Sequence, residues 1–407
     1  IMGYSPTPPV KPWSGVWERR RLADDLRPGG FTMRRNVLRT SLCGLLGIEY
    51  PIMLAGMWVK DGRATPPPLV AAVSNAGGLG VMAGLGLEPE ELRRRIQEVR
   101  KLTSKPFGVD LLLPASLSEV AEERQQVRDR LQREHPRQAA IARELMQKYG
   151  LPPVEEKGLA ELSPPLMRRQ VEVVVEEKVP VLAVALGDAG WAVSLAHAQG
   201  IKVIGLAGSL RNALRQQEAG VDIIVAQGYE AGGHTGTVAT LPLIPQVVDA
   251  VSPTPVVAAG GIADGRGLAA SLALGAVGVW CGTAFLLAAE SGLWQAHREQ
   301  IMAGASEDFI VTRCYTGKTA RDYRNPVIAD WGASGVEPLP MPLQWVLMDD
   351  FVAAAEAAEK AELINNPCGQ AAGMLREVKP ARRIVDEMVS GALEVYRRQE
   401  REIVRSA

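Results

Sequence analysis

Residues 222–236 read DIIVAQGYEAGGHTG, a short apolar run followed at once by a loop with glycines and a histidine. The apolar run 223–226 is typical of a buried strand. The glycines after it allow the backbone to approach a flat or charged ligand, because no side chain intervenes. His234 is the loop residue whose ordinary pKa lies near neutral pH. The segment therefore predicts a strand that carries a chemically active loop at its C-terminal end.

The same rhythm of strand and helix recurs on both sides of this segment. Apolar runs predict eight strands, at 52–54, 79–82, 107–111, 181–186, 202–206, 222–226, 255–259 and 277–281. Segments of helical periodicity predict helices near 66–76, 88–103, 189–199, 209–219, 240–251 and 264–275. Parallel strands joined by helical crossovers produce this alternation. Eight repeats favour a closed (β/α)8 TIM barrel, an α/β fold, over an open sheet.

The parts outside this rhythm suggest a division of the chain. We expect an N-terminal arm (1–40), a barrel (41–283) with a helical insertion after the third strand (115–178), a small and mostly helical cap over the substrate (284–370), and a C-terminal helix that packs on the barrel (371–407). The insertion contains a strongly charged run, 119–148. Such runs are usually solvated faces. The alternative is that the insertion serves as a lid or a dimer arm.

The composition narrows the class of protein. The 407 residues are 47% apolar, and their formal net charge is -1. This balance gives no electrostatic reason to expect nucleic acid or an anionic membrane as a partner. The four cysteines are far apart and form no C-x-x-C pair, so neither a metal site nor a disulfide framework is predicted. No apolar run approaches the roughly 18 residues that span a bilayer. We expect a cytoplasmic protein that acts on a small molecule, and a homodimer is compatible with the sequence.

Glycines follow the seventh and eighth predicted strands. Ala259 ends the seventh strand before Gly260 and Gly261, while Gly282 and Thr283 follow the eighth. In barrels of this kind, phosphate groups often bind after strands seven and eight. Backbone N–H groups at two helix N-termini can hold an anion without Lys or Arg. Glycine at one strand end often marks only a turn, but glycines at corresponding positions after two consecutive strands favour a phosphate site.

Two further strand ends carry candidate ligand-binding residues. Ala55, Gly56 and Met57 follow the first strand, where small residues would allow a planar ring to lie against the backbone. A tight loop with a core methionine is the alternative. Asp110 ends the third strand, where a carboxylate can accept hydrogen bonds from a ring N–H or a ribityl hydroxyl, or merely cap a turn.

The four histidines differ in position. His135 lies in the insertion, His197 on a crossover helix and His297 after the barrel, whereas His234 lies in the loop after the sixth strand. This position favours His234 as a general acid or base over a purely structural role. Glu230 could orient its imidazole or face solvent.

Four motifs together resemble a known family. AQGYEAGGHTG (226–236), AAGGIADGRG (258–267), GVWCGTAF (278–285) and PIMLAGM (51–57) resemble the FMN-dependent nitronate monooxygenases, formerly called 2-nitropropane dioxygenases. Flavin-dependent enoyl-acyl-carrier-protein reductases and NADH:quinone reductases are related to them. The resemblance covers about residues 44–375 and implies an FMN-binding barrel with a small covering domain.

The resemblance assigns roles to the candidate residues. It implies that His234 is the catalytic acid/base on the substrate side of the flavin, that Gly232 and Gly233 line the ring, and that Asp110 lies near its polar edge. The residues predicted to bind the cofactor are Ala55, Gly56, Met57, Asp110, Gly232, Gly233, Ala259, Gly260, Gly261, Gly282 and Thr283. No metal ligand is predicted.

Three positions depart from the family pattern. Most relatives end the third strand in Asn, whereas this chain has Asp110; the quinone reductases carry Lys at the tip of strand five, where this chain has Leu206; and many nitronate monooxygenases carry His on strand four, where this chain has Ala185. Leu206 argues against a quinone reductase, and Ala185 weakens the hypothesis of nitronate oxidation. With the long insertion, these departures suggest a subgroup with its own substrate.

Three functions follow, in order of preference. The first is oxidation of alkyl nitronates by FMN and O2 to a carbonyl compound and nitrite. The second is an ene reductase that acts on an enoyl thioester, with NAD(P)H as a transient reductant and His234 as proton donor. The third is a cofactor-free, phosphate-binding barrel isomerase or lyase.

Overall fold

The computed structural model describes residues 38–59, 63–113, 124–154, 164–185, 187 and 190–402. The expected N-terminal arm lies outside this range apart from residues 38–40. Residues 115–123 and 155–163 of the expected insertion, Leu186 of the fourth predicted strand and the last five residues of the chain also lie outside it.

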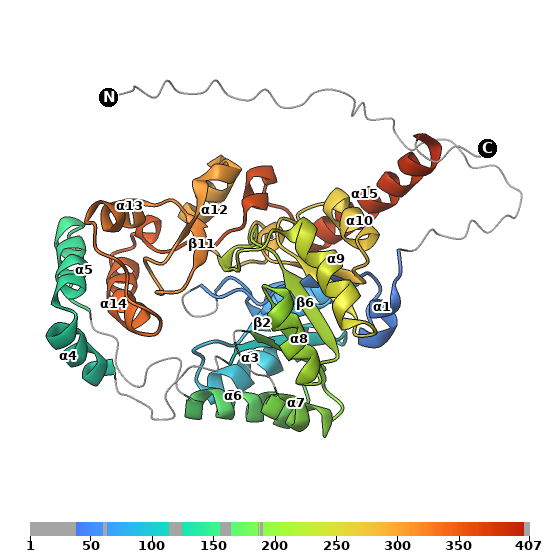
Figure 1. The fold of residues 1–407 in the computed structure, drawn as a ribbon, viewed down its shortest axis with the longest axis horizontal. Helices are drawn as coiled ribbons and strands as arrows, with labels where there is room; N and C mark the ends of the chain where they lie inside the picture. The colour runs from blue at the N-terminus through green and yellow to red at the C-terminus, as the bar shows by residue number, and fades with distance from the viewer. Residues whose placement is uncertain are drawn as a thin grey trace, which may run out of the picture. The chain divides into compact units, whose positions relative to one another are not determined.

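Eight parallel strands form the centre of the molecule (Figure 1). They are β1 (Ile52–Leu54), β2 (Gly80–Ala83), β3 (Phe107–Leu112), β4 (Val181–Ala185), β5 (Lys202–Ala207), β6 (Ile223–Gln227), β8 (Val256–Ala259) and β9 (Gly278–Cys281). Their hydrogen-bonded order is β1-β9-β8-β6-β5-β4-β3-β2. A parallel bridge between Met53 and Leu79 joins the two edge strands. The predicted (β/α)8 barrel is confirmed.

The strands are apolar on both faces because both faces are covered. Met53, Ile204 and Val225 belong to the cluster inside the barrel, whereas Val109 and Leu111 belong to the layer between strands and helices. Parallel sheets covered in this way read as near-continuous apolar runs, as the sequence does. The short helix α1 (Ser41–Leu46) contributes Leu42, Cys43 and Leu46 to the interior cluster.

Helices surround the barrel. They are α2 (Pro67–Asn75), α3 (Pro89–Leu102), α6 (Pro164–Glu176), α7 (Gly190–His197), α8 (Leu210–Glu218), α9 (Thr240–Val251), α10 (Gly265–Ala273) and α15 (Ala381–Glu402). The C-terminal helix α15 packs against α10 (Figure 1) and also against α2. Glycine permits the close approach, because a Cβ on Gly265 would lie 2.3 Å from the Ala392 nitrogen. Within the described residues, no helix has the length and apolar character required to cross a membrane.

The cap combines helices with a small sheet. Its elements are α11 (Thr283–Leu286), α12 (Gln295–Ala303), η2 (Ser306–Asp308), β10 (Phe309–Thr312), β11 (Ala320–Tyr323), α13 (Pro326–Ala333), α14 (Leu343–Ala357), η3 (Ala361–Leu363) and η4 (Gln370–Met374). The sheet order is β10-β11-β7, and β7 (Gly233–His234) comes from the loop after β6. The sequence did not predict this sheet, because a two-residue strand has no periodicity to detect. The loop with His234 is therefore part of both the barrel and the cap.

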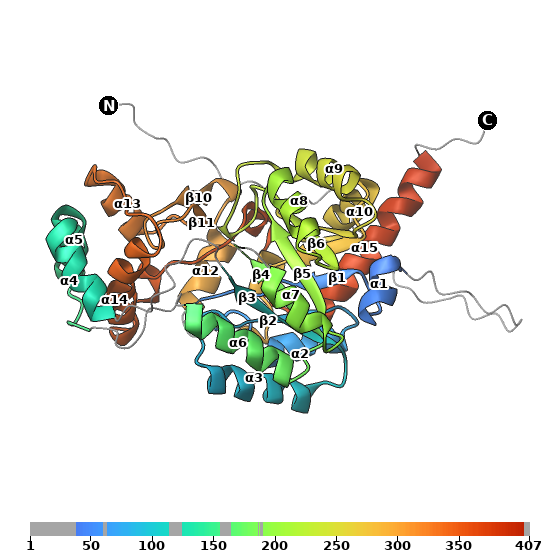
Figure 2. The same ribbon diagram turned by 60° about the horizontal axis from the view of Figure 1, so that its bottom comes forward.

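The insertion after β3 divides between two locations. α6 packs on α3, as a crossover helix of the barrel does, whereas α4 (Arg124–Glu134) and α5 (Pro136–Lys148) pack on α14 of the cap (Figures 1 and 2). The charged run of the insertion is only partly solvated. Arg124 forms a buried ion pair with Asp349 of α14 at 2.6 Å, and Arg128 pairs with Asp350 at 2.6 Å.

Candidate active site

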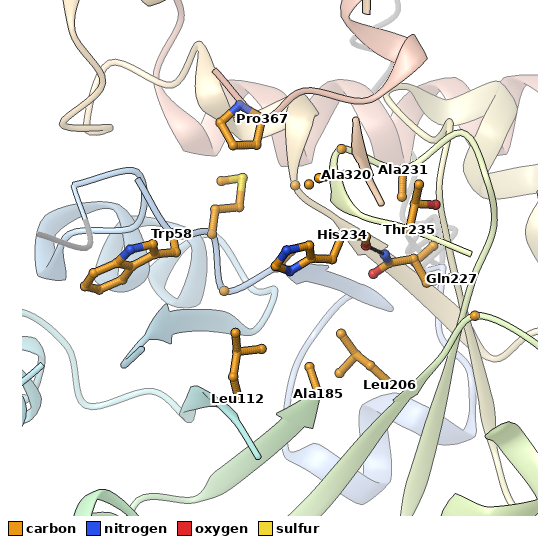
Figure 3. Close-up of a pocket in the computed structure, with 18 of the residues that line it drawn as sticks. Trp58, Leu112, Ala185, Leu206, Gln227, Ala231, His234, Thr235, Ala320 and Pro367 are labelled. Atoms are coloured by element: carbon orange, nitrogen blue, oxygen red, sulfur yellow. Dashed lines mark hydrogen bonds between the residues drawn. The ribbon is translucent and has the colours of Figure 1, made fainter. Parts of the chain in front are cut away.

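A cavity of about 1200 Å³ lies at the C-terminal ends of the barrel strands and is also lined by the cap. Figure 3 shows part of its wall, with His234 projecting towards the ends of β3, β4 and β5. All residues that the sequence predicts for the site line this cavity: His234, Ala55, Gly56, Met57, Asp110, Gly232, Gly233, Ala259, Gly260, Gly261, Gly282 and Thr283. The structure thus brings together segments from five strand ends.

The loop after β1 lies directly against the end of β3. A Cβ on Gly56 would lie 2.4 Å from the Asp110 Cβ, so the approach requires glycine. The Asp110 side chain is 9% exposed, and its Oδ1 has no hydrogen-bond partner among the described residues. Its register partners on β2 and β4 are Ala83 and Ala183, neither of which is charged. Burial raises the pKa of Asp110 to about 7. An unpaired buried carboxyl beside a cavity is a candidate to bind a ligand.

The glycines after β8 adopt backbone conformations that other residues avoid. Gly260 has φ of 101° and Gly261 has φ of 73°, and both line the cavity. The helix that follows is capped by a side chain. Asp264 caps α10 with its own carboxylate, which accepts hydrogen bonds from the N–H groups of Arg266 at 2.9 Å and Gly267 at 3.2 Å. Two of the first N–H groups of α10 are therefore occupied by its own cap and are not available to an anion.

Two of the predicted residues also join the barrel to the cap. The Thr283 hydroxyl accepts a hydrogen bond from the Gly369 N–H at 2.9 Å. A Cβ on Gly232 would lie 2.6 Å from the Cys368 carbonyl carbon. Glycine at position 232 is therefore required by packing against the cap, whatever its role towards a ligand.

His234 is held from both sides. Its backbone pairs with Ala320 of β11, and its carbonyl accepts a hydrogen bond from Gln227 Nε2 at 2.7 Å. Its Nε2 lies 3.1 Å from the Thr316 hydroxyl. Burial, assisted by the nearby Lys318 ammonium, lowers the pKa of His234 to about 4. The imidazole is therefore neutral at pH 7, and an anion bound beside it would raise its proton affinity.

The remaining polar candidates have structural roles. The Glu230 carboxylate accepts hydrogen bonds from the Thr240 N–H at 2.8 Å and hydroxyl at 2.6 Å, so it caps α9 and does not orient His234. His297 Nε2–H donates to the Ala361 carbonyl at 2.8 Å, and His197 pairs with Asp222. Neither histidine lines the cavity.

The cap supplies cavity residues that the sequence did not identify. Thr316 and Lys318 come from the β10–β11 connection, and Asp322 comes from β11. Asp322 is 2% exposed, its Oδ1 has no partner among the described residues, and burial raises its pKa to about 7. The only signal in the sequence was the polar character of residues 312–325. Ala185 and Leu206, the positions that depart from the family pattern, also line the cavity (Figure 3).

Residues 39–391 match the family model described as nitronate monooxygenase. The Mycobacterium tuberculosis protein Rv1533, provisionally named a monooxygenase, is 39% identical over 370 residues, which cover 86% of this chain and 96% of that protein. A protein of Staphylococcus aureus strain Newman, provisionally named a nitronate monooxygenase, is 34% identical over 363 residues, covering 86% and 97% respectively.

Solved structures show the same relationship. The nitroalkane oxidase from Streptomyces ansochromogenes superposes with a TM-score of 0.75 at 29% identity, covering 88% of this chain and 99% of that chain. FabK from Thermotoga maritima superposes with a TM-score of 0.70 at 32% identity, covering 89% and 99%. The family match extends over the barrel, the histidine loop and the cap. The chain therefore belongs to the nitronate monooxygenase family of flavin-dependent oxidoreductases.

Proposed function

We propose that the protein binds FMN and oxidises alkyl nitronates with O2 to carbonyl compounds and nitrite. The observation that carries the proposal is the shared cavity, in which the neutral imidazole of His234 lies with the glycine loops after β1, β8 and β9. Membership of the nitronate monooxygenase family supports the same reaction.

The residues of the cavity fit FMN. Ala55 and Gly56 line the cavity with small residues, which would allow a ring to lie close to the backbone of this loop. The unpaired Asp110 carboxyl offers a hydrogen-bonding group for the polar edge of such a ring. Gly260, Gly261 and Gly282 would hold the phosphate through backbone N–H groups. We therefore assign these residues, with Ala55, Met57, Gly232, Gly233, Ala259 and Thr283, to the FMN site.

The reaction balances without net proton transfer. Two nitronate anions and one O2 give two carbonyl molecules and two nitrite anions. When bound, FMN supplies the electron acceptor for this chemistry. His234 hydrogen-bonds the substrate and can hold a proton at the imidazole, while the Lys318 ammonium favours an anion beside it. Residues of β11 and of the β10–β11 connection line the same cavity.

The test uses protein reconstituted with FMN. With ethylnitronate as substrate, an oxygen electrode and a nitrite assay should give two nitrites per O2. His234→Asn should retain the flavin spectrum and lower kcat/KM by about 10²–10⁴-fold. FMN-loaded protein that is inert towards all alkyl nitronates would disprove the proposal. If such protein is bleached by NADPH under argon and reoxidised by an enoyl thioester, the ene reductase is the correct function.

A further inference from the structure

One wall of the cavity is an apolar face of the cap. Trp345, Met348 and Val352 lie three and four residues apart on α14, which places them on one side of the helix, and all three line the cavity. Trp58 after β1 and Leu112 at the end of β3 line it from the barrel (Figure 3). These side chains offer a surface that a hydrocarbon group can cover.

The charge of Asp349, on the same face of α14, is compensated by an ion pair. Asp349 also lines the cavity, but its carboxylate is 2.6 Å from the guanidinium of Arg124, and both side chains are buried. The ion pair comes from the packing of α4 on α14. This face of the cap therefore lacks an unpaired carboxylate to repel an anionic or apolar ligand.

A cation lies at another part of the cavity. Among the described residues, the basic side chains that line it besides His234 are Lys318 and Arg215; Arg215 is exposed on α8 and donates a hydrogen bond to Asn212. No carboxylate of the described residues lies within 4.0 Å of the Lys318 ammonium, and burial lowers the pKa of this group. A partly desolvated ammonium without a counter-ion is stabilised by a bound anion.

The cation is positioned beside the imidazole. The Thr316 hydroxyl accepts a hydrogen bond from the Lys318 backbone N–H at 3.3 Å and lies 3.1 Å from His234 Nε2. The ammonium also contributes to the lowered pKa of the imidazole. An anionic group bound at Lys318 would therefore lie near enough to the imidazole of His234 to interact with it electrostatically.

The cavity is larger than a single ligand needs. Its volume of about 1200 Å³ exceeds the range of roughly 300–1,000 Å³ that is usual for pockets of small molecules. Met348 and Val352 are 1% and 8% exposed and Trp345 is only partly buried, so the Trp345 indole is the main part of the α14 face that an apolar substituent would cover.

We propose that the natural substrate is a nitronate with a large alkyl or aryl substituent. Lys318 receives the anionic nitro group beside His234, and the apolar face of Trp345, Met348 and Val352 receives the substituent. This inference rests on the proposed nitronate oxidation and specifies its substrate class and the residues that select it.

The first experiment measures binding without catalysis. Linear carboxylates from propanoate to octanoate carry an anionic head but are not oxidised, so calorimetric titration of the FMN-loaded protein reports binding alone. The dissociation constant should fall by about fourfold for each added methylene until the apolar face is covered. Lys318→Met should weaken every member by a similar factor of about 10–100, and Lys318→Arg should restore most of the affinity.

The second experiment repeats these carboxylate titrations with variants of the apolar face. Trp345→Ala should reduce the gain per methylene, and Val352→Ala, which removes less volume, serves the same purpose if the tryptophan variant does not retain FMN. Leu241→Ala is the matched control, because Leu241 is 67% exposed on α9 and does not line the cavity; its dissociation constants should follow those of the wild type.

The results separate the inference from the proposed function. Equal affinity for short and long carboxylates, or wild-type affinity in Lys318→Met, would overturn the inference. The kcat/KM for 1-nitrohexane nitronate should exceed that for ethylnitronate, and equal values would overturn the substrate class while nitronate oxidation stands. If the carboxylates bind as expected but no nitronate is oxidised, the site for an anionic group with an apolar substituent is supported, and the proposed nitronate oxidation is disproved.

Discussion

Replacement of Asp110 by Asn should change how the free energy of unfolding depends on pH, because the Asp110 carboxyl is buried. The carboxyl is buried without a partner for Oδ1 among the described residues, and its pKa rises from 3.8 to about 7. The pKa of Asp110 is higher in the folded protein than in the unfolded chain, so protonation of this carboxyl favours the folded state. The resulting stability is fully present below pH 3.8 and is lost as the pH rises through about 7. Over this window the free energy of unfolding should fall by about 4 kcal/mol, at about 1.4 kcal/mol per pH unit. Asp110→Asn preserves the shape but cannot ionise, so it should lack this decline.

Urea unfolding of the flavin-free protein at pH 5 and pH 8 measures the effect. Relative to Asp110→Asn, the wild type should lose about 3 kcal/mol of unfolding free energy between these two pH values, since part of the window lies below pH 5. Contributions of other groups cancel in this difference. Asp249→Asn is the control, because Asp249 is exposed on α9, and its pH profile should parallel that of the wild type. Parallel profiles for the wild type and Asp110→Asn would refute the argument that an unpaired carboxyl is buried at this position.

Three further predictions concern other parts of the molecule. Gly56→Ala would place a methyl group 2.4 Å from the Asp110 Cβ, and it should abolish retention of flavin, measured by visible absorbance after gel filtration. Arg124→Met should destabilise the protein by about 3–5 kcal/mol in urea unfolding, because it leaves the Asp349 carboxylate buried without its guanidinium, and adding Asp349→Leu should recover most of the loss. In an NMR titration, the His234 resonances can be assigned as those that are missing from the spectrum of His234→Asn. They should report a neutral imidazole until the pH falls to about 4, and a transition near pH 6.5 would contradict the burial of this ring.

The location of the candidate site was predictable because its determinants are local. Parallel strands run in one direction, so residues that follow successive strands meet at one end of the barrel without any knowledge of their contacts. Asp110, His234 and the glycines after β8 were identifiable for this reason, and the structure places them around one cavity. Their individual roles were less predictable. Glu230 caps α9 and does not orient His234, because the fold brings its carboxylate to the Thr240 N–H, ten residues further along the chain, and no local pattern indicates that contact.

By itself, the sequence determined the barrel, the order of its strands along the chain and the loops that line the site. Apolar periodicity and glycine positions are local signals, which can be read from residues close together in the chain. Only the tertiary structure decided that β7 pairs with β11, that α4 and α5 belong to the cap, and that Lys318 and Trp345 line the cavity beside residues distant in the chain. The charge states of Asp110 and His234 were likewise decided by the fold. The physical reason is that pairing and desolvation depend on which distant segments exclude water from a group, and no pattern of neighbouring residues specifies that.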